Sequence, residues 1–354
     1  MLSAPPAPLD PASIRSTVEN LLCDFLNQQE EAAPDLPELA LFTGQLRDML
    51  TTGGKYIRPV LCVAGWLAVS GQTPSSSVWR VAASLELFHT FTLIHDDVMD
   101  HSDTRRGRPT AHRALAARHQ THPDSASLGV NAAILLGDLA LGWSYELLHH
   151  PGLTPHDLGM VRPGLNALRT ETLVGQYLDL TATGRPATDA RPAWRIIHYK
   201  TAQYTIVHPL RLGARLAGAT HGQLHDLSAY AVPLGEAFQL RDDLLGVFGD
   251  PGHTGKSALD DLREGKQTVL VATALGRSTP VQRHTLQELL GDPHLSQDTA
   301  DTLRDIFTAT GAAAAVEQMI ADRVGTAQRA LCDADLQPDA TVFLHNLASS
   351  VADR

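Results

Sequence analysis

The feature that most constrains this chain is a succession of long apolar segments with helical spacing, separated by short polar breaks. In the segment Val81–Asp100, apolar residues such as Val81, Leu85 and Phe88 recur near helical spacing while others occupy the remaining faces, which predicts a helix buried on nearly all sides. Four further stretches share this character: Ile134–Leu148, Pro163–Leu180, Ala193–Ala217 and Gln223–Phe248. The alternating Val, Ile and Thr runs of strands do not occur. The sequence therefore predicts an all-α protein.

The polar breaks carry no shift in composition that would mark a domain boundary. We therefore expect one helical domain over residues 13–354, preceded by a mobile, proline-rich tail at residues 1–12. The chain has 28 Lys and Arg against 39 Asp and Glu, a formal charge of −11, which argues against a nucleic-acid partner.

Localisation is predicted from what the sequence lacks. The N-terminus has neither the basic start nor the apolar segment of a signal peptide. The most apolar stretch, Ala132–Trp143, is interrupted by Asp138 and is too short to span a bilayer. Three widely separated cysteines indicate neither a disulfide framework nor a zinc site. These features predict a soluble, cytoplasmic protein without a membrane segment.

Two clusters of carboxylates end apolar helices and carry the first chemical signal. Asp96, Asp97 and Asp100 close the segment that begins at Val81, and Asp242 and Asp243 stand near the end of another. Residues at i and i+4 share a helix face, about 6 Å apart. Acidic side chains at a helix C-terminus oppose the helix dipole, by a few tenths of a kcal/mol each. Ligands that are all oxygen favour Mg²⁺ shared with substrate phosphates. The alternative for each cluster alone is a solvated acidic helix end.

Basic residues accompany these clusters at several places. Lys55 and Arg58 follow a double glycine in GGKYIRP, and Arg105 and Arg106 follow the first acidic cluster. Three further lysines complete the set: Lys200, Lys256 and Lys266. Guanidinium groups suit phosphate oxygens and lysine supplies a mobile positive charge. Each alone is typical of a solvated surface, but together with the carboxylates they indicate a cavity for two phosphorylated substrates.

The ordered motifs resemble those of the trans-isoprenyl diphosphate synthases, the polyprenyl synthetase family. The motifs that carry the resemblance are GGKYIRP, DDVMD, the RRG that follows it, GQYLDL, KTAQYT and FQLRDDLLGVFGD. The resemblance implies a bundle of long antiparallel helices around a central cavity. It implies condensation of isopentenyl diphosphate with an allylic diphosphate, and commonly a homodimer.

The resemblance also implies roles for individual residues. It implies three Mg²⁺ ions, with Mn²⁺ as a substitute, bound by Asp96, Asp100 and Asp242 with support from Asp97 and Asp243. It assigns Lys55, Arg58, His89 and Arg106 to isopentenyl diphosphate, and Arg105, Lys200 and Lys266 to the allylic diphosphate. Thr201, Gln239 and the backbone around Lys200 would stabilise the allylic carbocation.

One position departs from the family pattern. The second motif usually reads D-D-x-x-D, whereas here Gly246 occupies the fifth position. Asp250 lies beyond Gly249 and cannot simply take its place. The departure puts the third carboxylate of this motif in doubt.

Product length is predicted from the residues before Asp96, where the growing tail runs in this family. At 1.5 Å per residue, Phe91 lies about 7.5 Å and Phe88 about 12 Å from Asp96 along the helix axis. Thr92 between them and Asp96 is small. The pattern resembles short-chain synthases that make the twenty-carbon geranylgeranyl product, with the fifteen-carbon farnesyl product as the alternative. Ordinary core packing also accounts for both phenylalanines.

Two other functions share some of these sequence features. A class I terpene cyclase shares the fold and the first acidic motif, but its usual N-D-x-x-S-x-x-x-E motif is not found in this sequence. A non-catalytic partner subunit of a synthase would be marked by lost aspartates, and only Gly246 points that way.

Overall fold

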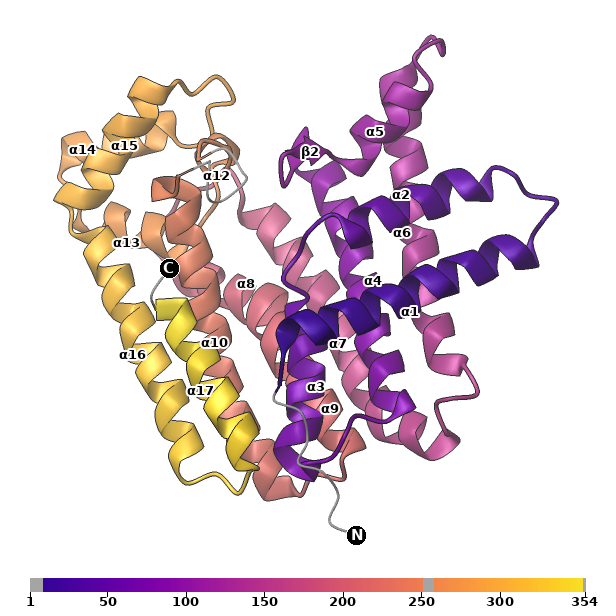
Figure 1. Cartoon of the computed structure of the whole chain (residues 1–354). Coiled ribbons are helices and arrows are strands. Elements are labelled where there is room, and N and C mark those ends of the chain that lie inside the picture. Colours follow the sequence, from indigo (N-terminus) through magenta and orange to yellow (C-terminus); the bar gives the residue numbers. More distant parts are fainter. Residues whose placement is uncertain (1–8, 251–257, 353–354) are drawn as a thin grey trace. The chain divides into compact units, whose positions relative to one another are not determined.

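The structure, a computed structural model, describes residues 9–250 and 258–352. These residues are helical almost throughout, which confirms the predicted fold class (Figure 1). The one sheet in the described ranges is an antiparallel hairpin of two two-residue strands, with Arg105 opposite Arg108. The chain divides into two compact units: unit 1 is Met1–Arg162 with Leu212–Gly218, and unit 2 is Pro163–Arg211 with Ala219–Arg354.

Unit 1 contains the N-terminal helices and the hairpin. Its elements are α1 (Pro11–Ala32), α2 (Leu39–Thr51), α3 (Ile57–Ser70), α4 (Ser76–Met99), β1 (Thr104–Arg105), β2 (Arg108–Pro109), α5 (Ala111–Arg118), α6 (Ser125–Glu146) and the short 3₁₀ helix η1 (Leu147–His149). Helix α7 (Pro155–Ala182) begins in this unit and continues into unit 2.

Unit 2 contains the remaining helices. Its elements are α8 (Arg191–Ile196), the π-helix η2 (Ile197–Val207), α9 (His208–Leu216), α10 (His221–Phe248), α12 (Asp260–Glu264), α13 (Val269–Arg277), α14 (Pro280–Leu289), α15 (Gln297–Ala309), α16 (Ala312–Cys332) and α17 (Pro338–Ala352). The last turns of α9 belong to unit 1.

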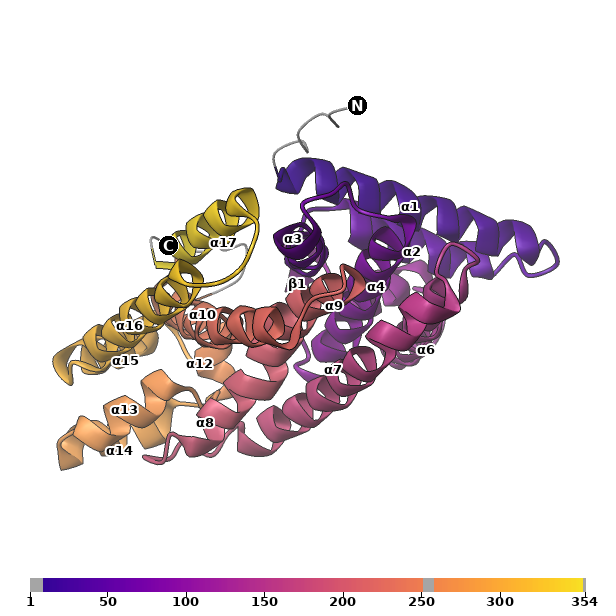
Figure 2. The same cartoon turned by 90° about the horizontal axis from the view of Figure 1, so that it is seen from below.

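Helix α4 is the centre of unit 1. It packs against α1, α3, α5 and α6 (Figures 1 and 2), and its buried residues face every direction around the axis. Each fully buried Leu or Phe contributes about 1.5–3 kcal/mol, so contacts on all sides hold this helix. The prediction of a helix buried on nearly all sides is confirmed.

Helix α10 is the central helix of unit 2, as α4 is of unit 1. It packs against η2, α16 and α17, and in both views α16 and α17 lie along it (Figures 1 and 2). Thr220 and Gln223 form a capping box at its first turn. The fully buried Tyr230 donates its hydroxyl to the carbonyl of Leu344 at 2.7 Å. Each unit is thus built around one long buried helix, which carries aspartates at its end in α4 and near its end in α10.

The predicted tail overlaps the first helix. Helix α1 begins at Pro11, and the side chain of Asp10 accepts hydrogen bonds from the amides of Ala12 and Ser13. Residues 1–8 lie outside the described residues. The single domain over 13–354 stays a prediction, because compactness does not tell whether either unit folds without the other.

Helix α6 has large apolar residues that are exposed. The stretch Ser125–His149 would be long and apolar enough to cross a membrane by length and composition alone, and 28% of its apolar window is buried. Exposed Ile134, Leu135 and Tyr145 share one face of α6 with Asp138. The rest of α6 packs on α4 and α5. One side of this helix is therefore an apolar surface that unit 1 leaves uncovered.

Candidate active site

The first acidic motif closes helix α4. Asp100 is the C-cap, and its amide donates to the carbonyl of Asp96 at 2.8 Å. The carboxyl groups of Asp96 and Asp100 are partly exposed, whereas that of Asp97 is 1% exposed. The motif therefore offers two accessible carboxylates one turn apart and one buried carboxylate.

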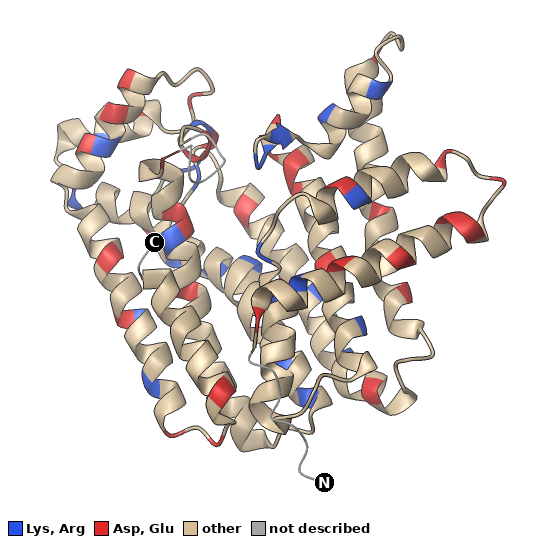
Figure 3. Ribbon diagram, viewed as in Figure 1, with Lys and Arg blue, Asp and Glu red and all other residues tan. Residues whose placement is uncertain are grey.

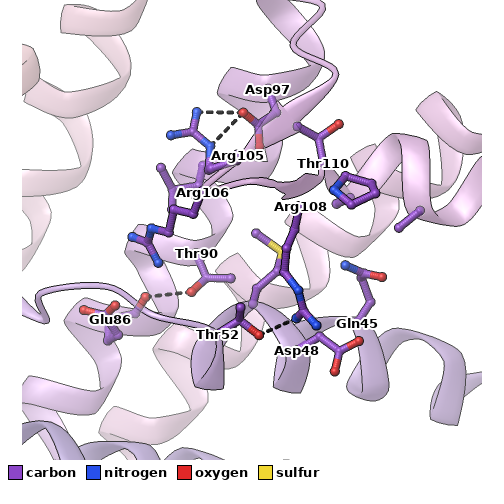
Figure 4. Close-up of a pocket in the computed structure, with 15 residues that line it drawn as sticks. Gln45, Asp48, Thr52, Glu86, Thr90, Asp97, Arg105, Arg106, Arg108 and Thr110 are labelled. Carbon is purple, nitrogen blue, oxygen red and sulfur yellow. Dashed lines mark hydrogen bonds and ion pairs between the residues drawn. The ribbon is translucent and has the colours of Figure 1, made fainter. Parts of the chain in front are cut away.

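The buried Asp97 is paired with Arg105 of the β1–β2 hairpin. Arg105 Nη2 lies 2.6 Å from Asp97 Oδ1, and Arg105 Nε donates to the same oxygen at 2.8 Å (Figure 4). The same guanidinium lies 3.6 Å from Asp96 Oδ2. Figure 3 shows the basic residues of the hairpin beside the acidic end of α4. The pair fixes the hairpin at the motif and offsets the buried negative charge.

Arg106 joins this hairpin to the double-glycine loop before α3. Its Nη1 donates to the carbonyl of Gly53 at 2.9 Å, and its guanidinium lies directly against Gly54, where a Cβ would come within 2.8 Å. Gly53 and Gly54 have φ values of 77° and 112°, which favour glycine. Tyr56 and Arg106 also have left-handed backbones. Such strain gathers at functional loops.

A pocket lies between α2, α4, α5 and this hairpin. Figure 4 shows its polar lining, which includes Arg105, Arg106, Arg108, Asp48 and Glu86. Glu86 is 6% exposed, and its Oε2 has no hydrogen-bond partner. Burial raises the pKa of Glu86 to about 7, although Arg58 and Arg106 favour its ionised form. A buried carboxyl group thus lies among the arginines assigned to isopentenyl diphosphate.

The other predicted residues of that set lie in the same unit. Arg58 is buried in the first turn of α3, and Lys55 is exposed in the loop before it. Burial and the positive charges of Arg58 and Arg106 hold the pKa of His89 well below its usual value. His89 is therefore a neutral imidazole at pH 7, and its ring can donate one N–H to a phosphate oxygen.

Two aromatic side chains precede the first motif along α4. Phe91 and Phe88 are 4% and 3% exposed. Their ring centroids lie 5.3 Å apart, and the Phe91 ring lies 4.8 Å from the ring of His95. Thr92 Oγ1 donates to the carbonyl of His89. The two phenylalanines thus form one aromatic cluster in the turns before Asp96.

The second acidic motif lies near the end of α10. Asp242 is exposed and Asp243 is buried. Gln239, one turn earlier, donates through Nε2 to Asp243 Oδ1 at 2.8 Å. Burial raises the pKa of Asp243 to about 7, against the opposing effects of Lys266 and this hydrogen bond. Asp242 is the accessible carboxylate of this motif.

Two lysines of unit 2 are paired with carboxylates to which the family resemblance assigned no role. Lys200 Nζ lies 2.6 Å from Oδ2 of the buried Asp179. Lys266 Nζ lies 3.8 Å from Asp261 Oδ1. Asp261 is the largest cause that raises the pKa of Lys266 well above its usual value. Both lysines are therefore held in ion pairs. Asp179 stands in GQYLDL, and this motif is the signal that could have identified it.

The space beside Gly246 is filled by Asp261. A Cβ at Gly246 would collide with Asp261 Oδ2 and would come within 2.9 Å of its Cγ. The carboxylate absent from the fifth position of the motif thus has a counterpart, which reaches the same place from α12. The spacing of the motif could not predict that Asp261 lies beside Gly246, because Asp261 belongs to another helix.

Thr201 and Gln239 also meet in unit 2, where Thr201 Oγ1 donates to Gln239 Oε1 at 2.5 Å. Lys256 lies outside the described residues.

The donor atoms fit Mg²⁺ that is bound together with a phosphorylated ligand. In the part of the chain that the structure describes, no three His, Cys, Asp or Glu side chains gather into a ready cage. Asp96, Asp100 and Asp242 instead present accessible oxygens. Mg²⁺ usually keeps several waters and takes one or two carboxylates plus substrate phosphates. The accessible carboxylates of each unit suit an ion that is bound in this way.

The fold and these sites define a helical protein whose carboxylates and fixed cations suit magnesium-bound diphosphates. The polyprenyl synthetase family model matches residues 40–307. The chain belongs to the polyprenyl synthetase family and is an enzyme that transfers prenyl groups.

Relatives and solved structures agree with this assignment. The chain is 32% identical to a short chain isoprenyl diphosphate synthase of Methanothermobacter thermautotrophicus, over 86% of this chain and 88% of that protein. It is 31% identical to a geranylgeranyl diphosphate synthase of Mycobacterium tuberculosis, over 81% and 77%. The crystal structure of geranylgeranyl pyrophosphate synthase from Corynebacterium glutamicum, complexed with isoprenyl diphosphate and magnesium, matches with a TM-score of 0.93 and 38% identity, over 98% and 99%.

We expect Gly246→Asp, which completes the D-D-x-x-D pattern, to destabilise the protein because the new side chain collides with Asp261. Overpacking of this kind costs about 1–3 kcal/mol, measured as a lower Tm. Adding Asp261→Gly should recover the loss. Gly276→Ala is the control, because Gly276 has open space around it. A Gly246→Asp protein as stable as the wild type would contradict this packing.

The raised pKa of Glu86 predicts that the stability of the protein depends on pH. The pKa of Glu86 is about 7 in the folded protein against 4.5 ordinarily, so the folded state keeps a proton that the unfolded chain releases between these values. Its contribution to stability is complete below pH 4.5 and is lost as the pH rises to 7. Glu86→Gln should flatten the fall of Tm over this range and add up to about 3 kcal/mol above pH 7. The exposed Glu31→Gln variant should follow the wild type, and an unchanged slope in Glu86→Gln would refute the assignment.

Proposed function

We propose that this enzyme condenses isopentenyl diphosphate with an allylic diphosphate to make geranylgeranyl diphosphate. The observation that carries the product length is the aromatic cluster of Phe88 and Phe91, buried in the turns before Asp96. Relatives named geranylgeranyl diphosphate synthase support the same length. The fifteen-carbon farnesyl product is the alternative, and a non-catalytic subunit is a more distant one.

The proposed reaction exchanges one carbon–oxygen bond for one carbon–carbon bond. The allylic carbon leaves its diphosphate, the isopentenyl double bond attacks the carbocation, and the departed pyrophosphate takes the proton. When bound, Mg²⁺ would neutralise the diphosphate and assist its departure. We propose Asp96, Asp100 and Asp242 as its ligands.

Cations of the chain would bind the two diphosphates. For isopentenyl diphosphate we propose Lys55, Arg58, His89 and Arg106. For the allylic diphosphate we propose Arg105, Lys200 and Lys266, with Lys256 as a further contact. Each of these three described cations is paired with a carboxylate, which limits the positions that its charged group can take. A cation held in this way binds a diphosphate with little further loss of side-chain entropy.

Thr201 and Gln239 would stabilise the allylic carbocation. Their hydrogen bond fixes both oxygens, since Thr201 Oγ1 donates to Gln239 Oε1. Both atoms carry partial negative charge. We propose that these oxygens and the carbonyl groups around Lys200 face the charge that develops when the diphosphate departs.

We further propose that two copies of the chain associate through the exposed face of α6. Ile134, Leu135 and Tyr145 form this face together with Asp138, whose side chain is 62% exposed. A lipid contact is disfavoured because an aspartate costs about 2.5–3.5 kcal/mol at the bilayer centre. In unit 2, Leu173, Tyr177 and Leu180 form a second exposed apolar stripe, on α7. A soluble, cytoplasmic homodimer accounts for both surfaces.

The product proposal is tested by incubating the enzyme with Mg²⁺, labelled isopentenyl diphosphate and each allylic starter. Chain length is read from the dephosphorylated alcohols. We expect a dominant twenty-carbon alcohol from the wild type and longer alcohols from Phe91→Ala, because the shortened side chain deepens the space before Asp96. The control is Phe248→Ala, an exposed phenylalanine in unit 2. An unchanged chromatogram for Phe91→Ala would show that this residue does not limit the chain.

The dimer proposal is tested by light scattering after gel filtration. The wild type should have twice the chain mass of 38.1 kDa, and Leu135→Glu should shift it towards the monomer by burying a charge in the interface. Val342→Glu on α17 is the matched control, since Val342 is equally exposed at 60%. A monomeric wild type, or a Leu135→Glu protein that remains dimeric, would contradict the proposal.

A further inference from the structure

Two of the residues proposed to act on the allylic substrate lie in a π-helix. Helix η2 covers Ile197–Val207, and Lys200 and Thr201 are in its first half. π-helices are rare, usually occur as single turns, and gather at functional sites. The hydrogen bonds of a π turn reach one residue further than those of an α turn, so side chains point in directions that an α-helix does not allow. A run of this length therefore requires support from its neighbours.

Two glycines from neighbouring helices contact this segment in unit 2. A Cβ at Gly175 of α7 would lie 2.5 Å from the amide nitrogen of Lys200 and 2.8 Å from its Cα. A Cβ at Gly235 of α10 would lie 2.5 Å from Cα and 2.7 Å from Cβ of Ala202. The atoms in the way are mainly backbone, which cannot rotate aside. Glycine alone allows α7 and α10 to approach η2 this closely.

Each glycine is followed, one helical turn later, by the polar partner of an η2 side chain. Asp179 lies four residues after Gly175 and binds Lys200 Nζ at 2.6 Å. Gln239 lies four residues after Gly235 and accepts from Thr201 Oγ1 at 2.5 Å. Residues four apart share a helix face, so the glycine and the polar residue of each helix both face η2. The close approach at the glycine sets the distance at which the polar pair forms.

The contact on α10 continues to the second acidic motif. Gln239 also donates to Asp243, four residues further along the same face. Gly235, Gln239 and Asp243 thus form one row from the η2 backbone to the aspartate pair. A shift of α10 away from η2 would move all three together.

We propose that Gly175 and Gly235 are positioning residues of the active site, which hold η2 between α7 and α10 so that Lys200 and Thr201 point correctly. This inference rests on the proposed function, in which Lys200, Thr201 and Gln239 act on the allylic substrate. In this role the glycines act on the backbone of residues 199–202 and not on the substrate.

The test compares Gly175→Ala and Gly235→Ala with matched controls in the same helices. Gly159→Ala in α7 and Gly222→Ala in α10 add the same methyl group where Gly159 has nothing within 4 Å and Gly222 only a side-chain oxygen at 3.8 Å. We expect kcat to fall about a hundredfold in the first pair, with the KM for isopentenyl diphosphate unchanged, and both constants unchanged in the controls. A smaller fraction of folded protein would also lower the apparent kcat. A second measurement must therefore distinguish this loss from a local change at η2.

Hydrogen exchange supplies that readout without substrate or metal. Amides of residues 197–207 should exchange faster in Gly175→Ala and Gly235→Ala, while the controls keep wild-type rates. If the wild type has no synthase activity, the proposed function fails, and the exchange result still decides whether the glycines hold η2. Wild-type exchange and wild-type kcat in both variants would overturn the inference.

A variant that does not fold is resolved by a second substitution. Ala202→Gly removes the Cβ that lies 2.7 Å from the methyl group added at position 235. If Gly235→Ala is unfolded, the pair Gly235→Ala with Ala202→Gly should contain more folded protein than Gly235→Ala alone, because one of its two shortest contacts is removed while Cα of residue 202 stays at 2.5 Å. A folded fraction that does not rise in the pair would overturn the inference for Gly235.

Discussion

The ion pair between Arg105 and Asp97 is the interaction on which unit 1 depends at its functional end. A carboxylate that is 1% exposed at a helix C-terminus would be costly alone. The hydrogen bond from Arg105 Nε and the ion-pair contact of its Nη2 offset that cost and fix the β1–β2 hairpin at the end of α4. The neighbouring Arg106 is fixed with it and reaches the carbonyl of Gly53. One buried pair thereby orders both basic loops beside the accessible carboxylates Asp96 and Asp100.

In unit 2, carboxylates form ion pairs with lysines in a similar way. Asp179 and Asp261 pair with Lys200 and Lys266, and Asp261 is the largest cause that raises the pKa of Lys266. Asp242 stays exposed in the same unit. An accessible carboxylate suits a divalent cation with open coordination positions. The two units therefore share a design in which some carboxylates orient cations and others remain accessible to magnesium.

The departure at Gly246 shows how a sequence motif and a structural site can differ. The family pattern places a third aspartate on α10, whereas this chain brings Asp261 of α12 to the same space. The carboxylate of Asp261 lies directly against Gly246, so a side chain at this position would require Asp261 to move. A carboxylate therefore occupies the space beside Gly246 although the motif lacks its third aspartate, and Gly246 by itself no longer indicates a non-catalytic subunit.

The sequence by itself determined the helical class, the two aspartate motifs and the family, because periodicity, residue type and order are local properties of the chain. Only the tertiary structure decided that Asp179 binds Lys200, that Asp261 covers Gly246 and that Ile197–Val207 is a π-helix. The predicted helix over Ala193–Ala217 was correct in kind, but apolar spacing does not distinguish an α turn from a π turn inside a buried segment. These features depend on contacts between residues far apart in the chain, where close packing of backbones sets which side chains can meet.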